Sequence, residues 1–482
     1  MIKLLITLEI FLYLLQITIA ATASNKNLVC YYEVESSHRY GFSNFTFNHL
    51  KKGAAHCTHL VYASAHLVPK TYGIRFPPQH QLLYEPKLLK KAYPQLKIYL
   101  SIGGDGDAND KQDPLKYLHL LEEDNHRRGK FIEQTMEILK LYEFDGVDLA
   151  FPLPRNKPKE ESNMAAFLND VNRMFAGDKR NEYRHFYSKF IAELKEACDI
   201  KHLDLTMTVL PNVNSSVYFD VAEIHRNFKF INLFAFDFNT PERNPSEADY
   251  SSPLYFNPQQ HRLPYANVDF QVNYWLQNGC PSTKLNLGIA TYGRAWKVTI
   301  ESGMNGQPII ENTNGTGTVG NSFFSWPTIC KYLVTRKQHQ QPMREYTDRY
   351  GNYAFRPANY NNTGLWISYD GPKFAATKVR YALQKSLGGM VVYDLSRDDF
   401  KGRCHKNDFP ILRAIREILD QTLKATTQQP ILGISVIQPR TKAVPKGMKV
   451  ISGAVRRKSN RQQSALEKLS NGLHLMQIFA PE

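Results

Sequence analysis

Eight short apolar runs recur along the chain up to residue 393, and stretches with helical spacing lie between several of them. Apolar strands that alternate with amphipathic helices are typical of a parallel sheet, because parallel neighbours need a long crossover connection. Eight such strands suit a sheet that closes on itself. The sequence therefore predicts an α/β fold, the (β/α)8 or TIM barrel, with strands at Leu28–Tyr32, Leu60–Ala63, Leu96–Ile102, Gly146–Phe151, Leu205–Leu210, Phe230–Phe236, Leu285–Ala290 and Gly389–Tyr393.

The connections between these strands contain helical patterns. Apolar residues recur at helical spacing between the third and fourth strands, and we interpret this stripe as packing against the sheet. It comprises Phe131, Ile132, Met136, Leu139 and Tyr142. The long connection after the fourth strand is expected to hold two helices, at Asn163–Phe175 and Tyr183–Cys198.

Two further segments do not fit a simple barrel. Residues 297–362 are rich in Gly, Asn and aromatic residues, and they leave room for a small α+β insertion domain between the seventh and eighth strands. After Leu419 the periodic pattern ends, so we place the barrel at residues 24–419 and a tail at residues 420–482. A hydrophobic content of 42% excludes a wholly disordered chain.

The tail carries much of the positive charge. Of a formal net charge of +15, the residues from Gln421 onward hold ten Lys or Arg and two Glu, and thus contribute +8. The run from Lys442 to Arg461 suits an acidic polysaccharide or a membrane surface. A solvated, disordered tail without a specific partner is the simpler interpretation, and both remain open.

The first residues resemble a secretory signal. Lys3 precedes an apolar run from Leu4 to Ala20, and small residues at Ala20, Ala21 and Ala23 offer cleavage positions. We expect residues 1–23 to be removed and the protein to be extracellular. A signal anchor is the alternative, although the run is short for a membrane span, and no other stretch is long and apolar enough to cross a bilayer.

Secretion makes the six cysteines candidates for disulfides, but six cysteines allow fifteen complete pairings and their spacing does not choose among them. Asn-x-Ser/Thr triplets agree with an extracellular route. They occur at Asn44, Asn214, Asn314 and Asn361, and Asn214 follows the expected fifth strand most clearly.

Several segments, in order and at suitable spacing, resemble one family. They are LVCYY (28–32), CTHLVY (57–62), PQLKIYLSIGGD (94–105), FDGVDLAFPLPRNKP (144–158), TVLPNVNSSVYFD (208–220), FINLFAFDFNTPER (230–243), NYWLQNGCPSTKLNLGIATYGRAWK (273–297) and GGMVVYDLSRDDFKGRC (388–404). Together they are similar to the chitinase-like proteins of glycoside hydrolase family 18, and more closely to the insect imaginal disc growth factors. The resemblance covers about residues 25–419 and implies a TIM barrel.

The catalytic strand of this family carries D-G-x-D-x-D-x-E. By resemblance the first two acids fall on Asp145 and Asp148, the third falls on Ala150, and the glutamate that protonates the leaving sugar falls on Pro152. Proline has no proton to give, and a positioned general acid contributes roughly 10²–10⁴-fold to a rate. The growth-factor members typically have Gln at this position, so Pro152 departs even from them. The resemblance therefore implies a protein without chitinase activity.

The resemblance also implies what remains of a sugar cleft. Candidate ligand-binding residues are Tyr31, Asp145, Asp148, Asp237, Tyr292, Arg294 and Tyr393. Phe236 stands where chitinases have a tyrosine, and Tyr393 stands where they have a tryptophan floor. Each unmade hydrogen bond in a buried site costs about 1–3 kcal/mol, so sugar binding should be weakened. A purely structural role remains open for Asp145 and Asp148, and core packing remains open for Tyr393.

The family disulfides carry over to Cys30–Cys57 and Cys330–Cys404, which leaves Cys198 and Cys280 as free thiols or as a further bridge. No metal or cofactor is expected. The run His56–His59 superficially suggests zinc, but Cys57 is expected to be bridged. The acids Asp105 and Asp107 suggest a calcium or phosphate loop, but their segment matches a strand-to-loop turn of the family.

Three functions follow from these observations. The resemblance implies a secreted, non-catalytic growth factor that supports cell proliferation, polarity and motility together with insulin-type signals, through an unknown cell-surface receptor. The second is a secreted lectin for chito-oligosaccharides without hydrolase activity. The third is a hydrolase with a rerouted acid, which lacks a carboxylate at positions 150 and 152. Expected partners also include an acidic glycan but no nucleic acid, and no membrane span is expected after removal of the signal.

Overall fold

A computed structural model describes residues 26–76, 84–108, 113–122, 125–156, 177–245, 247–258, 263–300, 313–314, 323–334, 343–359, 364–404 and 406–428. The side chains of residues 125, 177–180, 313–314 and 423–428 are not part of this description. Several predictions lie outside it: the signal segment 1–23, the helix at Asn163–Phe175, the site at Asn361, the side chain of Asn314, and the tail beyond residue 428.

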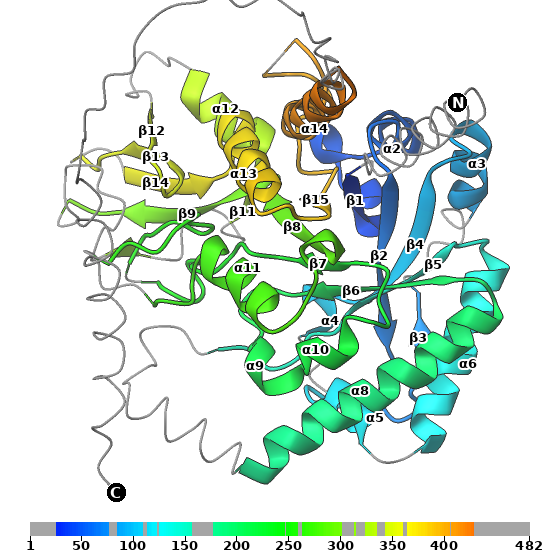
Figure 1. Cartoon of the computed structure of the whole chain (residues 1–482). Coiled ribbons are helices and arrows are strands. Elements are labelled where there is room, and N and C mark those ends of the chain that lie inside the picture. Colours follow the sequence, from blue (N-terminus) through cyan, green and yellow to red (C-terminus); the bar gives the residue numbers. More distant parts are fainter. Residues whose placement is uncertain are drawn as a thin grey trace, which may run out of the picture. The chain divides into compact units, whose positions relative to one another are not determined.

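Eight parallel strands form a closed barrel (Figure 1). β1 pairs with both β15 and β2, and these two pairings close the sheet. The barrel strands are β1 (Asn27–Glu33), β2 (His59–Leu67), β4 (Lys97–Gly103), β5 (Gly146–Ala150), β6 (Asp204–Val209), β7 (Ile231–Leu233), β8 (Leu285–Ala290) and β15 (Gly389–Tyr393). Each overlaps a strand expected from the sequence, so the TIM-barrel prediction is confirmed. A short strand, β3 (Ile74–Arg75), pairs antiparallel with the end of β2.

Helices cover the outside of the barrel. The apolar stripe predicted from residue 131 to residue 142 belongs largely to α6, and Phe131 is fully buried with its ring 5.5 Å from that of Phe190 in α8. The helices are α2 (Phe47–Ala54), α3 (Glu85–Ala92), α4 (Asp105–Ala108), α5 (Lys116–Leu121), α6 (Asn125–Leu141), α8 (Gly177–Ile200), α9 (Ser215–Tyr218), α10 (Val221–Ile224), α11 (Val268–Gln277), α13 (Pro372–Gln384) and α14 (Pro410–Gln428), with short 3-10 turns η1 (Val34–His38), η2 (Gly41–Ser43) and η5 (Ser282–Lys284).

A second, antiparallel sheet follows β8. Its strands are β9 (Tyr292–Val298), β10 (Thr313–Asn314), β11 (Phe323–Ser325), β12 (Arg344–Thr347), β13 (Asn352–Arg356) and β14 (Gly364–Tyr369), and it carries the helix α12 (Trp326–Val334). The sheet has a small aromatic core of its own, in which the rings of Tyr353 and Trp366 stack at 5.2 Å. The strands of this sheet begin at Tyr292 and end at Tyr369, so the sheet extends beyond residues 297–362 on both sides.

Two disulfides join neighbouring parts of the fold. Cys30 in β1 is bonded to Cys57, which lies two residues before β2, and their Cα atoms are 6.0 Å apart. Cys330 in α12 is bonded to Cys404, which lies in the segment after β15. Cys198 and Cys280 are buried free thiols, and burial raises the pKa of each to about 12. Both therefore stay protonated and unreactive at neutral pH.

His59 makes the stability of the barrel sensitive to acid. Its ring is 7% exposed and lies against Phe230 and Tyr99, and burial lowers its pKa from 6.5 to about 4. The unfolded chain gains a proton below about pH 6.5, whereas the folded chain stays neutral until about pH 4. The free energy of unfolding should therefore fall by about 2–3 kcal/mol on this account as the pH drops from 7 to 4.5.

His59→Gln is expected to remove this part of the acid sensitivity, as measured by urea unfolding at the two pH values. The exposed His185→Gln serves as the matched control and should behave like the unmodified protein. An unchanged pH dependence in His59→Gln would contradict the assignment.

Candidate functional site

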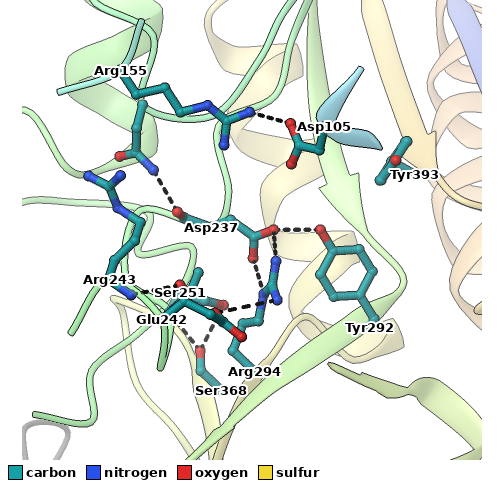
Figure 2. Close-up of polar contacts among 12 residues, drawn as sticks. Asp105, Arg155, Asp237, Glu242, Arg243, Ser251, Tyr292, Arg294, Ser368 and Tyr393 are labelled. Atoms are coloured by element: carbon teal, nitrogen blue, oxygen red, sulfur yellow. Dashed lines mark hydrogen bonds and ion pairs between the residues drawn. The ribbon is translucent and has the colours of Figure 1, made fainter. Parts of the chain in front are cut away.

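Five of the residues predicted for a cleft meet at the carboxyl ends of the barrel strands. The rings of Tyr31 and Tyr393 are 5.6 Å apart, and the ring of Tyr292 lies 6.4 Å from that of Tyr393. Figure 2 shows Asp237 between Tyr292 and Arg294, with Tyr393 nearby. Parallel barrels gather their functional groups at this face because the loops after the strands open there.

Asp237 forms the ionic centre of this face. Its carboxylate accepts hydrogen bonds from Nε and a terminal nitrogen of Arg294 (2.8 and 2.7 Å) and from the Tyr292 hydroxyl (2.6 Å). Both charged residues are less than a tenth exposed. The guanidinium also lies 3.7 Å from the centre of the Phe323 ring. A bidentate pair of this kind is held rigidly, so Asp237 is already occupied by the protein itself.

The backbone at Asp237 is constrained as well. Its φ is +53°, in the left-handed region that costs a non-glycine residue energy, and its carbonyl oxygen accepts a 2.7 Å hydrogen bond from the Asn212 side chain. The surrounding contacts thus determine where this carboxylate points.

Asp148 lies deeper, inside the barrel. It is fully buried, and hydroxyl groups donate to both of its oxygens. The donors are Tyr31 (2.9 Å), Ser101 (3.0 Å), Thr206 (2.9 Å) and Thr208 (2.9 and 3.0 Å). Burial raises the pKa of Asp148, and these hydroxyls oppose that shift. We call this arrangement the hydroxyl cage.

The hydroxyl cage was not predicted, although a sequence signal for it exists. Ser101, Thr206 and Thr208 are polar positions within otherwise apolar strands. Barrel strands alternate inward and outward residues, so isolated polar residues at inward positions indicate a polar layer inside the barrel. Asn232 extends the layer by donating to the Tyr31 hydroxyl at 3.1 Å.

Tyr393 forms a half-buried floor to the face. Its ring stacks on Phe236 at 5.9 Å, and its hydroxyl donates to Glu33 at 3.0 Å. Burial raises the pKa of Tyr393 well above its usual value. Glu33 in turn pairs with Arg39 at 2.8 Å. Sequence reasoning missed Glu33, because it closes the first strand without matching a motif.

Asp145 does not join the other predicted cleft residues. It precedes β5 and lies at the amino end of that strand, where its carboxylate accepts a 2.9 Å hydrogen bond from the Ile98 backbone. Lys90 pairs with it at 3.1 Å. Asp145 thus ties two strands together at the opposite end of the barrel, which agrees with the structural role left open above.

Ala150 and Pro152 lie at the carboxyl end of β5, where the cleft opens. Asp148 faces the barrel interior, and Phe151 packs outward against Phe190 of α8. Side chains alternate along a strand, so Ala150 shares the inward side with Asp148, and Pro152 follows two residues after the end of β5. The Ala150 carbonyl accepts a 2.7 Å hydrogen bond from Gly104. A Cβ on Gly103 would lie 2.3 Å from the same carbonyl oxygen, so only glycine permits this close approach.

An ion pair spans the loops beside these residues. Asp105 begins α4, directly after β4, and pairs with Arg155, which follows β5. Figure 2 shows this pair across the face from Arg294, with Asp105 near Tyr393. Both residues belong to loops whose conformation no strand pattern predicts, and Arg155 was missed for that reason.

No group of three or more potential metal ligands is found among the described residues. Within the same part of the chain, no helix is both long and apolar enough to cross a membrane. Cys57, which belongs to the His56–His59 run, is bonded to Cys30.

Comparison with known proteins agrees with this geometry. The model of the glycosyl hydrolases family 18 matches residues 27–398. The chain is 44% identical over 419 residues to chitinase-like protein Idgf1 of Glossina morsitans morsitans, which covers 82% of this chain and 94% of that protein. It is 38% identical over 415 residues to chitinase-like protein Idgf3 of Drosophila melanogaster, over 81% of this chain and 93% of that protein.

Solved structures show the same fold. Catalytic domain 2 of the Group II chitinase of Ostrinia furnacalis superposes with a TM-score of 0.67 at 22% identity, over 83% of this chain and 97% of that one. Human YKL-39 superposes with a TM-score of 0.65 at 25% identity, over 82% of this chain and 100% of that one.

Proposed function

The chain belongs to the glycosyl hydrolases family 18, and we propose that within this family it is a secreted, non-catalytic growth factor. The observation that carries the proposal is the pair of Ala150, the last residue of β5, and Pro152, two residues beyond it. If the family motif is laid on this strand, a general acid would stand at position 152. Neither residue carries an ionisable group, so the strand supplies no proton donor to a glycosidic oxygen.

Three carboxylates around the face are held by groups of the protein itself. Asp237 is bonded to Arg294, Asp105 is paired with Arg155, and Asp148 is enclosed by the hydroxyl cage. Burial raises the pKa of Asp394 to about 6, which suits a general acid, but this residue is 0% exposed and so out of a substrate's reach. The described residues therefore favour a binding or signalling role over hydrolysis.

The relatives support only the coarser assignment to chitinase-like proteins. Two of them carry the name chitinase-like protein, with the designations Idgf1 and Idgf3. We infer that this protein is released from cells and supports their proliferation, polarity and motility together with insulin-type signals, through a receptor that the chain does not identify. The two disulfides of the fold agree with an oxidising, extracellular environment.

A proliferation assay tests the growth-factor role. Purified secreted protein, added to insect cells in low-insulin medium, is expected to increase cell number, and the increase should grow when insulin is added. Heat-inactivated protein is the control. Equal cell numbers with and without the folded protein, at every insulin concentration, would remove the proposed role.

A second candidate, a lectin for chito-oligosaccharides, is favoured by the aromatic floor. The ring of Tyr393 is partly exposed and rests on the buried ring of Phe236, and sugars dock on aromatic faces. Human YKL-39 is described as a pseudo-chitinase with retained chitooligosaccharide binding properties. Calorimetry with N-acetylglucosamine oligomers distinguishes the candidates. Tight binding that Tyr393→Ala abolishes would favour the lectin. No detectable binding, together with retained growth activity, would favour the growth factor.

We predict that Asn214 carries a glycan more readily than Asn44. Asn214 caps α9 through its carbonyl oxygen, which accepts from the Ser216 backbone at 3.1 Å. Within the described contacts its amide nitrogen donates no hydrogen bond, so it is available for attachment. The Asn44 amide nitrogen instead donates to the Ser37 carbonyl at 2.8 Å. Glycopeptide mass spectrometry of insect-cell material is expected to find Asn214 occupied, and an unmodified Asn214 would refute this prediction.

A further inference from the structure

An open pocket of about 890 Å³ lies beside the barrel mouth. One wall comes from Arg39 and from η2, which contains Phe42. Another comes from β11 and α12, and a third from the segment after β15. The Cys330–Cys404 disulfide joins the second wall to the third, so these walls are held together covalently. The volume of the pocket lies within the range of about 300–1,000 Å³ that is typical of ligand sites.

The lining of this pocket is strongly basic. Among the described residues, six cationic side chains line it against one carboxylate, that of Asp399. The six are Arg39, Lys331, Arg356, Arg397, Lys401 and Arg403. We call this site the basic pocket.

The neighbouring acids neutralise only part of this charge. Glu33 pairs with Arg39 at 2.8 Å, and Arg397 lies 3.7 Å from Glu33 and 3.8 Å from Asp394. Asp399 is fully buried, and one of its oxygens accepts a 2.7 Å hydrogen bond from the Cys404 backbone. An excess of positive charge therefore remains at the opening of the basic pocket.

The exposed cations are arranged around aromatic rings. Arg403 lies 3.8 Å from the centre of the Phe42 ring, and the Lys401 ammonium donates to the Phe42 carbonyl at 3.0 Å. Phe42 itself is 74% exposed. Phe323 and Tyr332 add further rings to the lining.

Rings and guanidinium groups together suit a particular ligand chemistry. Guanidinium groups bind sulfate and carboxylate through paired hydrogen bonds, and aromatic faces bind the apolar faces of sugar rings. Several cations within one pocket call for a ligand with closely spaced anionic groups. We propose that the basic pocket binds a sulfated, acidic glycan segment. The extracellular source of this ligand rests on the proposed secretion, but the binding itself does not depend on the growth-factor role.

Titration of the full-length secreted protein with a heparin-derived octasaccharide, in 0.15 M NaCl at pH 7.4, tests this proposal. The triple variant Lys331→Gln, Lys401→Gln, Arg403→Gln removes three exposed cations of the basic pocket. It is expected to weaken binding roughly tenfold or more, since exposed ionic contacts each contribute modestly. Raising the salt to 0.5 M should weaken binding by the unmodified protein, because salt screens exposed charges.

A matched control removes the same charge elsewhere. Lys91→Gln, Lys130→Gln, Lys189→Gln alters three exposed lysines on α3, α6 and α8, and it should leave binding within about twofold of the unmodified protein. An equal loss in the pocket and control variants would show that net charge alone drives binding, and would overturn the proposal. Thermal unfolding midpoints close to that of the unmodified protein would confirm that all variants are folded.

The basic run after residue 421 provides a competing site within the same chain. Arg456→Gln, Arg457→Gln, Lys458→Gln is expected to leave most of the octasaccharide binding intact. Loss of binding in this tail variant alone, with full binding in the pocket variant, would move the site away from the basic pocket and overturn the proposal.

Two further ligands test the assigned chemistry. An unsulfated hyaluronan octasaccharide is expected to bind more weakly than the sulfated one, because it carries fewer charges. Equal affinity for an oligodeoxynucleotide of the same net charge would mark a general polyanion surface and contradict a glycan site. A failed proliferation assay with intact, pocket-dependent octasaccharide binding would remove the growth-factor role and leave this site standing.

Discussion

Purified secreted protein is expected to release no product from a fluorogenic chito-oligosaccharide, at any pH from 4 to 8. Ala150 and Pro152 offer no proton at the end of β5, and the loss of a general acid alone lowers a rate by roughly 10²–10⁴-fold. The assay should run beside an active chitinase of the same family at equal protein concentration. Turnover above about one per cent of that enzyme, which survives repeated purification, would contradict a non-catalytic assignment.

Restoring the two acids is expected not to restore an efficient enzyme. Ala150→Asp with Pro152→Glu adds two carboxylates at and just after the end of β5, and the oxygens of Asp148 in this strand are already bonded within the hydroxyl cage. Phe236 brings no hydroxyl to the face, and Arg294 holds Asp237. Single-turnover measurements on the double variant should therefore remain at least about a hundredfold below the active chitinase. A rate close to that enzyme would mean that these two positions alone separate this chain from catalysis.

Asp237→Ala is expected to lower the free energy of unfolding by about 3–5 kcal/mol, because the buried guanidinium of Arg294 loses its bidentate carboxylate and keeps the longer 3.9 Å pair with Glu242. Arg294 is 7% exposed, so water does not replace the lost partner. Urea unfolding at pH 7, followed by circular dichroism, measures this change. The hydroxyl of Tyr292 also loses its acceptor, which adds to the cost.

The control for this prediction is an exposed ion pair. Lys87 pairs with Glu143 at 3.1 Å, and their side chains are 71% and 51% exposed. Lys87→Ala should cost less than about 1 kcal/mol. The double variant Asp237→Asn, Arg294→Met should recover part of the stability lost in Asp237→Ala, because no unpaired charge stays buried. A loss below about 1 kcal/mol in Asp237→Ala would show that this pair is not structural.

The barrel was predictable because its strands are continuous and apolar. Runs such as Leu285–Ala290 carry their signal in consecutive residues, and strand order in a parallel barrel follows chain order. The site was predictable only where a motif fixed it, as for the Tyr292 and Arg294 pair. Glu33 and Arg155 escaped, since their partners come from distant segments and depend on loop conformation.

The misplacement of Asp145 has a simple physical origin. Asp145 and Asp148 are three positions apart, and along a strand such residues point to opposite faces and lie about 10 Å apart. Periodicity alone therefore argues against one cleft for both. Both residues belong to the family motif, but Asp145 precedes β5 and accepts from the Ile98 backbone, whereas Asp148 lies within β5 and faces the barrel interior.

The hydroxyl cage satisfies the polar groups inside the barrel when no ligand is bound. In an enzyme, polar groups that await a substrate stay unsatisfied, and their strain is relieved only when the substrate arrives. Here Tyr31, Thr206 and Thr208 satisfy Asp148 from within the barrel. The hydrogen bonds of Asp148 are therefore satisfied by the protein itself, without a ligand. Loops at the mouth are then free to diverge toward new partners while the barrel beneath them stays intact.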